Sequence, residues 1–225
     1  MRAAEVYRRI RAAVPEHVTV VLACKKRTAE EVAALMEAGA ADLGHNYVQE
    51  AEAMIAALGP AAFEARWHMI GPLQTNKINK ALGLFDAIQT VGSAEQARAI
   101  SERAERAGKR ISALVEVNSG REPRKSGIMP DYPAILDLAR AIAELPALRL
   151  EGLMTMGPFL DDPEGLRGPF RATRELFDRL RDQNIPGTEI RTLSMGMSDS
   201  YEVAIEEGST MIRLGTIVFG ARPEG

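Results

Sequence analysis

The stretch Val18-Thr19-Val20-Val21-Leu22-Ala23-Cys24-Lys25-Lys26 determines how the rest of this chain is interpreted. Its run of β-branched and small apolar residues predicts a strand that is buried on both faces. The strand ends in two lysines, and burying a lysine is unfavourable unless it reaches water or serves a chemical purpose. In a barrel of parallel strands this end carries the active site, and a partly buried lysine there can form an imine with an aldehyde. The simpler alternative is that both lysines mark the solvent-exposed end of the strand.

Short apolar segments alternate with amphipathic segments along the whole chain. Thr28 and Ser93 stand at predicted helix N-caps, with Glu31 and Gln96 at the capping-box position three residues later. Strands are predicted over residues 18–25, 42–46, 67–71, 87–91, 111–118, 148–154, 189–194 and 211–215. This alternation predicts an α/β fold, a closed (β/α)8 barrel of the TIM type. An open doubly wound sheet would carry a glycine-rich turn after its first strand, and this chain has none there.

Length, charge and cysteine content are those of an ordinary globular protein. We expect residues 1–225 to form a single barrel domain. The 28 basic and 31 acidic residues give a net charge of −3, which favours neither nucleic acid nor a membrane surface as a partner. The single cysteine excludes an internal disulfide, and no apolar run reaches the roughly 18 residues of a transmembrane helix. The charged amphipathic start does not resemble a secretory signal, so we expect a cytoplasmic protein.

Two loops at the predicted carboxyl ends of the strands have the composition of a phosphate site. Ser194-Met195-Gly196-Met197-Ser198 follows the seventh strand and turns into a helix, which offers hydroxyl and backbone N–H groups to an anion, although it is also compatible with a plain helix cap. Gly215-Thr216 offers further N–H groups after the eighth strand. Barrels often bind phosphate between these two loops. A lysine across the barrel mouth from a phosphate site is the arrangement that a pyridoxal phosphate (PLP) enzyme requires.

Taken together, these motifs resemble the pyridoxal phosphate homeostasis proteins, the proline synthetase co-transcribed family, over nearly the whole chain. Two departures stand out: His45 occupies a usually acidic position, and Cys24-Lys25-Lys26-Arg27-Thr28 replaces the family's Ser-Lys-Thr-Lys-Pro. The resemblance implies a fold similar to the N-terminal barrel of alanine racemase, a fold type III PLP protein, without the second β-domain of that enzyme. The motifs that carry it are the lysine strand, Gly44-His45-Asn46-Tyr47-Val48-Gln49-Glu50, Trp67-His68-Met69-Ile70-Gly71-Pro72-Leu73-Gln74-Thr75-Asn76-Lys77, Gly152-Leu153-Met154, Leu193-Ser194-Met195-Gly196-Met197-Ser198-Asp199 and Ile212-Arg213-Leu214-Gly215-Thr216.

The resemblance also implies which lysine binds the cofactor. The family's spacing from its lysine to the glycine that ends the next helix, here Gly39, selects Lys25 as the residue that forms the imine with PLP. Neighbouring strand residues point to opposite faces, so Lys26 would then face the helices. The spacing, and not the alternation, decides which of the two lysines faces the barrel.

The remaining cofactor contacts also follow from the resemblance. Asn46 would lie beside the cofactor ring or its phenolic oxygen, and His68 either lies over the ring or is a structural histidine. Arg213 would face the pyridine nitrogen; because it stays protonated it donates to that nitrogen and leaves it a poor electron sink, although a salt bridge at the barrel rim is the alternative. The phosphate ligands would be Ser194, Gly196, Ser198, Gly215 and Thr216.

The expected function is therefore a monomeric carrier that holds PLP as a lysine imine, takes part in intracellular PLP homeostasis without turnover, and hands PLP to PLP-dependent apoenzymes. One alternative is a PLP-dependent amino-acid racemase, which would need the additional β-domain and a catalytic tyrosine opposite the lysine. The other is an aldolase that uses the lysine on a sugar phosphate. No metal site is expected, because His17, His45 and His68 lack metal-ligand spacing.

Overall fold

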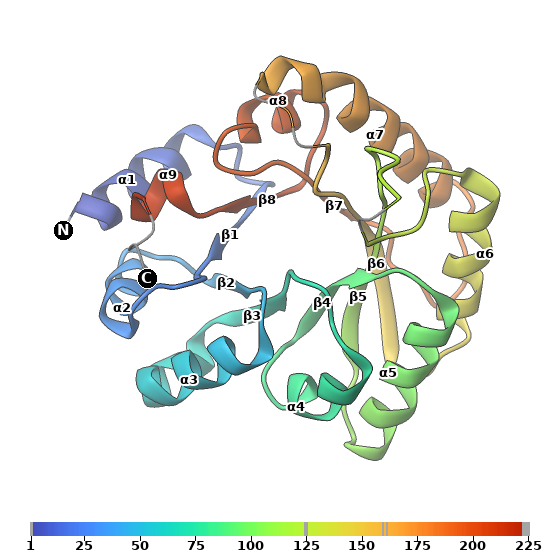
Figure 1. Cartoon of the computed structure of the whole chain (residues 1–225), viewed down its shortest axis with the longest axis horizontal. Helices are drawn as coiled ribbons and strands as arrows, with labels where there is room; N and C mark the ends of the chain where they lie inside the picture. The colour runs from blue at the N-terminus through green and yellow to red at the C-terminus, as the bar shows by residue number, and fades with distance from the viewer. Residues whose placement is uncertain (1, 124–125, 159, 161, 222–225) are drawn as a thin grey trace.

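The computed structural model describes residues 2–123, 126–158, 160 and 162–221, so residues 1 and 222–225 of the predicted domain lie outside the described residues. Parallel strands β1 to β8 pair in chain order and close into a barrel, which confirms the predicted (β/α)8 architecture (Figure 1). The strands are β1 (Thr19–Ala23), β2 (Asp42–His45), β3 (Arg66–Met69), β4 (Ala87–Val91), β5 (Ile111–Glu116), β6 (Leu148–Met154), β7 (Thr192–Ser194) and β8 (Met211–Leu214).

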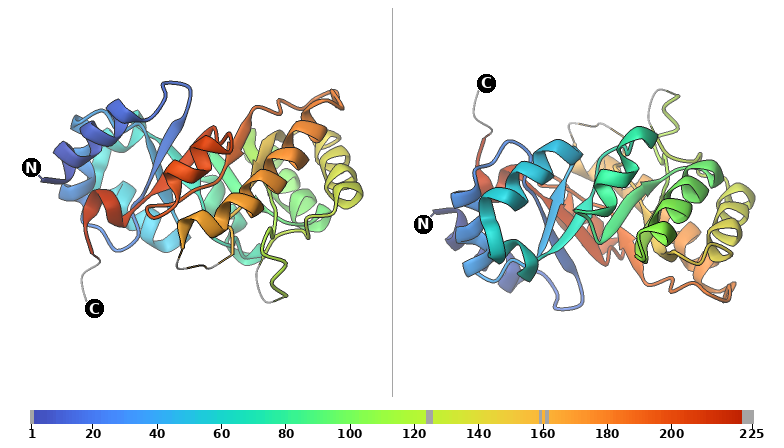
Figure 2. Two further views of the ribbon diagram at one scale, coloured as in Figure 1. Left: turned by 90° about the horizontal axis from the view of Figure 1, so that it is seen from above. Right: turned by 90° about the horizontal axis from the view of Figure 1, so that it is seen from below.

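Helices cover the outside of the barrel, as the views in Figure 2 show from two sides. The last helix, α9, packs beside the first, α1, so that the ring of helices closes where the chain begins and ends. No helix in the described part of the chain combines the length and the apolar character needed to span a bilayer. The helices are α1 (Arg2–Ala13), α2 (Ala29–Glu37), α3 (Val48–Leu58), α4 (Ile78–Leu82), α5 (Ala94–Arg106), α6 (Tyr132–Ala143), α7 (Arg167–Arg181), α8 (Tyr201–Glu206) and α9 (Thr216–Phe219).

The predicted capping signals fix the start of two helices. Thr28 accepts a hydrogen bond from the Glu31 amide, and the Glu31 carboxylate accepts one from the Thr28 amide, which completes the capping box of α2. Ser93 caps α5 through the Gln96 amide, but the Gln96 side chain accepts its bond from the amide of residue 92 instead of from Ser93. These caps end the loops above β1 and β4 at defined residues.

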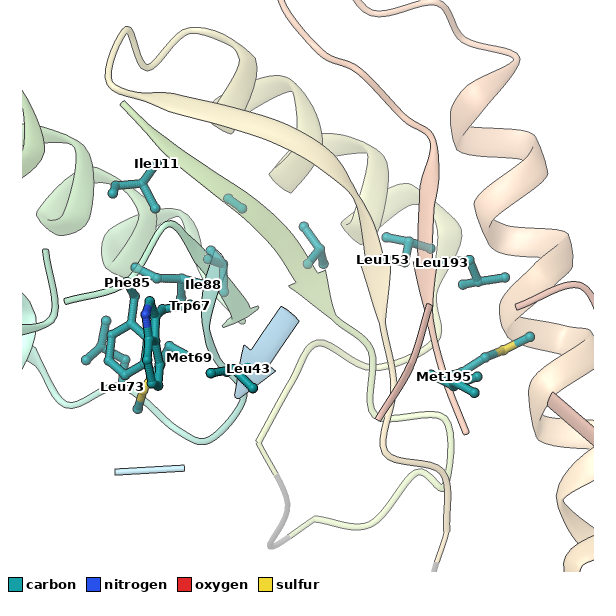
Figure 3. Packing of buried hydrophobic residues seen from close by; sticks show 14 of the residues in the cluster. Leu43, Trp67, Met69, Leu73, Phe85, Ile88, Ile111, Leu153, Leu193 and Met195 are labelled. Carbon is teal, nitrogen blue, oxygen red and sulfur yellow. The ribbon is translucent and has the colours of Figure 1, made fainter. Parts of the chain in front are cut away.

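Strand residues alternate between the barrel interior and the layer beneath the helices. Leu22 and Cys24 of β1 belong to the hydrophobic core that the helices cover, and Figure 3 shows members of the same core on other strands, among them Leu43, Trp67 and Ile88. Val21 points the other way, into the barrel interior. Its Cγ1 would lie 3.0 Å from a Cβ built on Gly44, which faces the interior from the neighbouring strand. The main core therefore lies between sheet and helices, and the interior is left to a different set of side chains.

A polar cluster fills the interior near the amino ends of the strands. The carboxylate of Glu151 on β6 is 3% exposed and accepts hydrogen bonds from Ser112 at 2.7 Å and from Arg66 at 3.1 Å. Arg149 and Arg191 also lie against it, with N–O distances of 2.8 Å and 3.4 Å. Although burial opposes ionisation, the Ser112 hydroxyl and the arginines hold the pKa of Glu151 below its usual range. This end of a barrel contributes to stability, while the opposite end carries the site.

Candidate functional site

A cavity of about 510 Å³ opens at the carboxyl ends of the strands, the end at which barrel proteins build their sites. It brings together five residues that the sequence singled out from three separate loops, although those loops are far apart in the chain. These five are Asn46, Ser198, Arg213, Gly215 and Thr216, and the other wall residues are Ala23, Ile70, Met156, Met197, Asp199 and Ala221.

Ser198 joins the two loops that the sequence assigned to phosphate binding. Its hydroxyl oxygen accepts hydrogen bonds from the amides of Gly215 at 3.1 Å and Ile217 at 3.2 Å. Ser198 lies in the turn that leads into α8, which begins three residues later at Tyr201. The arrangement concentrates hydroxyl and amide groups at one wall of the cavity, which suits an anionic group.

Arg213 supplies a buried positive charge at the cavity wall. Its Nη1 donates to the Ser194 hydroxyl at 2.6 Å, and its Nη2 donates to the Thr155 carbonyl at 2.8 Å. Burial lowers the pKa of Arg213 to about 10, an effect that nearby Glu116 opposes, so the guanidinium is still charged at neutral pH. Among the described residues Arg213 makes no salt bridge, which was the alternative interpretation; Ser194 and Thr155 accept its hydrogen bonds instead.

Ser194 and Gly196 are not among the residues that line the cavity. Ser194 is fully buried, and its hydroxyl donates to Gln89 Oε1 at 2.7 Å while it accepts from Arg213. Gly196 has a φ of +94°, its carbonyl accepts from the Arg213 amide at 3.0 Å, and a Cβ on it would come within 2.5 Å of the Ala204 Cβ. Both residues thus contact Arg213, and their assignment as phosphate ligands stays a prediction.

His68 also lies below the cavity and does not contribute to its wall. It is 1% exposed, its Nε2 is 2.8 Å from Asp42 Oδ1, and its Nδ1 is 3.1 Å from Gln89 Nε2. Both ring nitrogens are therefore used inside the barrel. Of the two interpretations left open by the sequence, the structural histidine agrees with this position.

The two lysines lie in the turn that follows β1, beyond the residues that strand alternation orients. The Nζ of Lys25 lies 5.0 Å from the centroid of the Tyr47 ring, a cation–π contact, and Lys25 is not among the residues that line the 510 Å³ cavity. Lys26 adopts a left-handed φ of 57° and lines a separate cavity of about 390 Å³ between the sheet and α3, together with Cys24 and His45. The assignment of the imine to Lys25 therefore stays a prediction from the family spacing.

A second chamber of about 370 Å³ continues from the first and was not foreseen from the sequence. The two chambers share Asn46, Ile70, Met156 and Met197 as wall residues. The new chamber contains Glu116, whose Oε1 accepts a bond from Ser126 at 2.9 Å and whose pKa is raised by burial. Strand alternation on β5 could have predicted an inward carboxylate here, because every second residue of the strand joins the outer core.

Among the described residues, no group of three or more His, Cys, Asp or Glu side chains is arranged to hold a metal ion. The polar groups that line the larger cavity are instead hydroxyl, amide, guanidinium and the carboxylate of Asp199, and Lys25 lies two residues after the wall residue Ala23. These groups fit a small molecule with a phosphate and an aldehyde, because amides and hydroxyls bind phosphate and an amine condenses with an aldehyde.

Comparison with known proteins defines the class first. The alanine racemase N-terminal domain family matches residues 2–223. Alanine racemase from Clostridium difficile 630 has the same barrel, with a TM-score of 0.81 at 18% identity, covering 99% of this chain and 57% of that one. At that identity the likeness concerns the fold alone.

Closer relatives then define the family. The protein named pyridoxal phosphate homeostasis protein in Pasteurella multocida strain Pm70 is 38% identical to this chain, and the match covers 92% of this chain and 88% of the relative. The protein of the same name in Escherichia coli K12 is 36% identical, and that match covers 92% of this chain and 87% of the relative. PipY of Synechococcus elongatus PCC7942 has a TM-score of 0.89 at 30% identity, covering 97% of this chain and all (100%) of PipY. A second PipY structure, with PLP bound, has a TM-score of 0.87. This chain belongs to the pyridoxal phosphate homeostasis proteins.

Proposed function

We propose that this protein binds PLP through an imine with Lys25 and holds it as a carrier in intracellular PLP homeostasis. The observation that carries the proposal is the 510 Å³ cavity, which gathers Asn46, Arg213, Gly215 and Thr216 beside the strand that leads to Lys25. The names of the relatives and the PLP-bound structure of PipY support the same ligand. PLP supplies an aldehyde that condenses with an amine and a phosphate that anchors the molecule.

Each polar wall residue has a proposed role toward that ligand. The Ser198 hydroxyl and the Thr216 amide bind the phosphate, and Gly215, whose amide donates to the Ser198 hydroxyl oxygen, lines the same wall. Asn46 contacts the ring or its phenolic oxygen. Arg213 donates to the pyridine nitrogen, and because a guanidinium does not give up its proton, it leaves that nitrogen unprotonated. Lys25 has to turn from the Tyr47 ring toward the cavity, which its long flexible side chain permits.

The proposed role of Arg213 favours binding without turnover. A ring whose nitrogen stays unprotonated withdraws electrons poorly, so it stabilises a carbanion poorly. Racemisation also requires an acid–base group opposite the lysine, whereas Tyr47 lies against Lys25 itself. We therefore infer a monomeric, cytoplasmic carrier whose recipients are PLP-dependent apoenzymes, and we retain amino-acid racemisation and sugar-phosphate aldol cleavage as alternatives.

The experiment compares the wild-type protein with Lys25→Ala and the matched variant Lys26→Ala. After incubation with PLP and reduction with borohydride, mass spectrometry should find the adduct on a peptide containing Lys25. Lys25→Ala should lose the adduct and the yellow absorption, while Lys26→Ala keeps both. Retention of the adduct by Lys25→Ala, together with its loss in Lys26→Ala, would move the assignment by one residue.

Turnover is tested separately on the PLP-loaded wild-type protein. Incubation with single L-amino acids, followed by chiral chromatography, should produce no D-enantiomer above that formed by free PLP. Sustained racemisation by the monomer would instead establish the racemase alternative. Cleavage of a sugar phosphate without PLP, with a borohydride-trapped adduct on Lys25, would establish the aldolase.

A further inference from the structure

Five polar side chains form one continuous series of hydrogen bonds through the barrel interior, from β8 to β2. Arg213 Nη1 lies 2.6 Å from Ser194 Oγ, and Ser194 Oγ lies 2.7 Å from Gln89 Oε1. Gln89 Nε2 lies 3.1 Å from His68 Nδ1, and His68 Nε2 lies 2.8 Å from Asp42 Oδ1. We call these five residues the interior series. It begins at the cavity wall and ends below the cavity, at the first residue of β2.

The donors in the interior series all point the same way. Arg213 can only donate, so Ser194 accepts from it and must give its own proton to Gln89 Oε1. The Gln89 amide then donates to His68 Nδ1 and to Met211 Sδ, the latter at 3.2 Å. With Nδ1 acting as acceptor, His68 carries its proton on Nε2 and donates it to the Asp42 carboxylate. The series therefore runs from a cation to an anion without a reversed bond.

Because the interior series is buried, the loss of any one of its hydrogen bonds is costly. Arg213, Ser194, Gln89 and His68 are buried, and only the Asp42 side chain, which is 22% exposed, reaches solvent. A buried donor or acceptor that loses its partner is costly, so each member constrains the next. The hydroxyl of Ser194 has no freedom to rotate away from Arg213 as long as Gln89 accepts its proton. The series thus holds the Nη1 end of the guanidinium through Ser194, while the Thr155 carbonyl and the Met156 sulfur accept from Nη2.

We propose that Asp42, His68, Gln89 and Ser194 are positioning residues, which hold the Arg213 guanidinium in the orientation that receives the pyridine nitrogen of PLP. The inference rests on the proposed function, because it assigns a task to the Arg213 side chain at that site. None of the four positioning residues touches the cofactor. Their effect on cofactor binding is transmitted through Arg213 alone, and this distinguishes positioning from a general contribution to the fold.

A double-mutant cycle between Gln89→Leu and Arg213→Met tests this transmission. The dissociation constant of PLP is measured by absorption in the four full-length proteins; the imine keeps binding measurable when Arg213 is replaced. Gln89→Leu should weaken binding about tenfold when Arg213 is present, because Ser194 loses the acceptor that holds its hydroxyl against the guanidinium. In the Arg213→Met background the same substitution should change the constant by less than about twofold.

Two further variants separate positioning from folding. Gln89→Glu retains the acceptor for Ser194 and should recover most of the affinity lost in Gln89→Leu. Ser112→Ala removes a different interior hydrogen bond, in the cluster around Glu151, and should lower thermal stability without changing PLP affinity. If Gln89→Leu does not fold, Ser194→Ala replaces it in the cycle, because it removes a single oxygen atom.

The possible failures can be told apart. An equal loss of affinity from Gln89→Leu in both backgrounds overturns the positioning role, as does a loss from Ser112→Ala of the same size. Absence of any PLP adduct on the wild-type protein overturns the proposed function itself, before the cycle is measured.

Discussion

His45 gives this barrel a predictable sensitivity to acid. The side chain is 1% exposed and stacks on Trp67 with ring centroids 6.0 Å apart. Neither ring nitrogen has a hydrogen-bond partner among the described residues, and the nearest carboxylate oxygen, Glu50 Oε2, lies 4.0 Å from Nδ1. Burial lowers the pKa of His45 from 6.5 to about 4. Because the folded-state pKa is depressed, the unfolded chain binds the proton first as the pH falls. The stability that neutral His45 contributes is complete above about pH 6.5 and is lost toward pH 4.

The size of this effect follows from the same pKa values. Each pKa unit corresponds to about 1.4 kcal/mol, so the wild-type protein should lose about 2 kcal/mol of unfolding free energy through His45 between pH 7 and pH 5. His45→Phe keeps an aromatic ring against Trp67 and cannot titrate. In urea unfolding followed at pH 7, 6 and 5, the stability of this variant relative to wild type should therefore rise by about 2 kcal/mol over that range.

A stability difference between His45→Phe and wild type that stays constant from pH 7 to pH 5 would refute the claim that burial of an imidazole without hydrogen bonds controls the acid response.

Two other substitutions test the scaffold around the site. Gly196→Ala should destabilise the protein by about 2–5 kcal/mol in urea unfolding, because the strain of a left-handed φ adds to a 2.5 Å clash with Ala204. The control Gly92→Ala should cost less than about 1 kcal/mol, because its Cβ would lie 3.6 Å from the nearest neighbour. Equal losses of stability in the two variants would contradict the geometry. Glu151→Gln should cost about 2 kcal/mol at pH 7, less than in a fully buried ion pair because its arginines are partly exposed. Since the folded-state pKa of Glu151 is lowered, its contribution is present above about pH 4.3 and disappears at lower pH, so the wild-type and variant stability curves should converge below pH 4.

The sequence was sufficient to predict the strands and helices whose hydrophobic pattern and capping residues indicate the same structure. β1 and β5 are long apolar runs, and the box at Thr28 fixes the start of the following helix. It was less informative where local structure depends on a distant loop. Residues 216–219 carry no helix signal, yet they form α9, because Ser198 accepts the amides of Gly215 and Ile217 from another part of the chain. Local pattern contains no sign of such a contact.

Sequence spacing identified the loops of the site but not the depth of each side chain. Ser194 and Ser198 are four residues apart in one motif, yet Ser194 is the last residue of β7 and points into the barrel, while Ser198 lies beyond the turn at Gly196 and reaches the cavity. Gln89 was overlooked because it stands in an otherwise apolar strand. A signal was nevertheless present, since a glutamine in a fully buried strand requires partners for its amide.

The interior of this barrel is unusual for its fold, because TIM-type barrels are commonly filled by layers of branched apolar side chains. Here the upper interior holds Gln89, Ser194 and Arg213, with Glu116 nearby, and all four are buried. Polar groups in such a place destabilise a protein unless they are fully hydrogen-bonded, and apolar residues of similar volume would stabilise it more simply. An uninterrupted series from a cation to a carboxylate is therefore difficult to explain by stability alone. It becomes understandable if the guanidinium has to present one fixed face to a ligand, which is the requirement that PLP would impose.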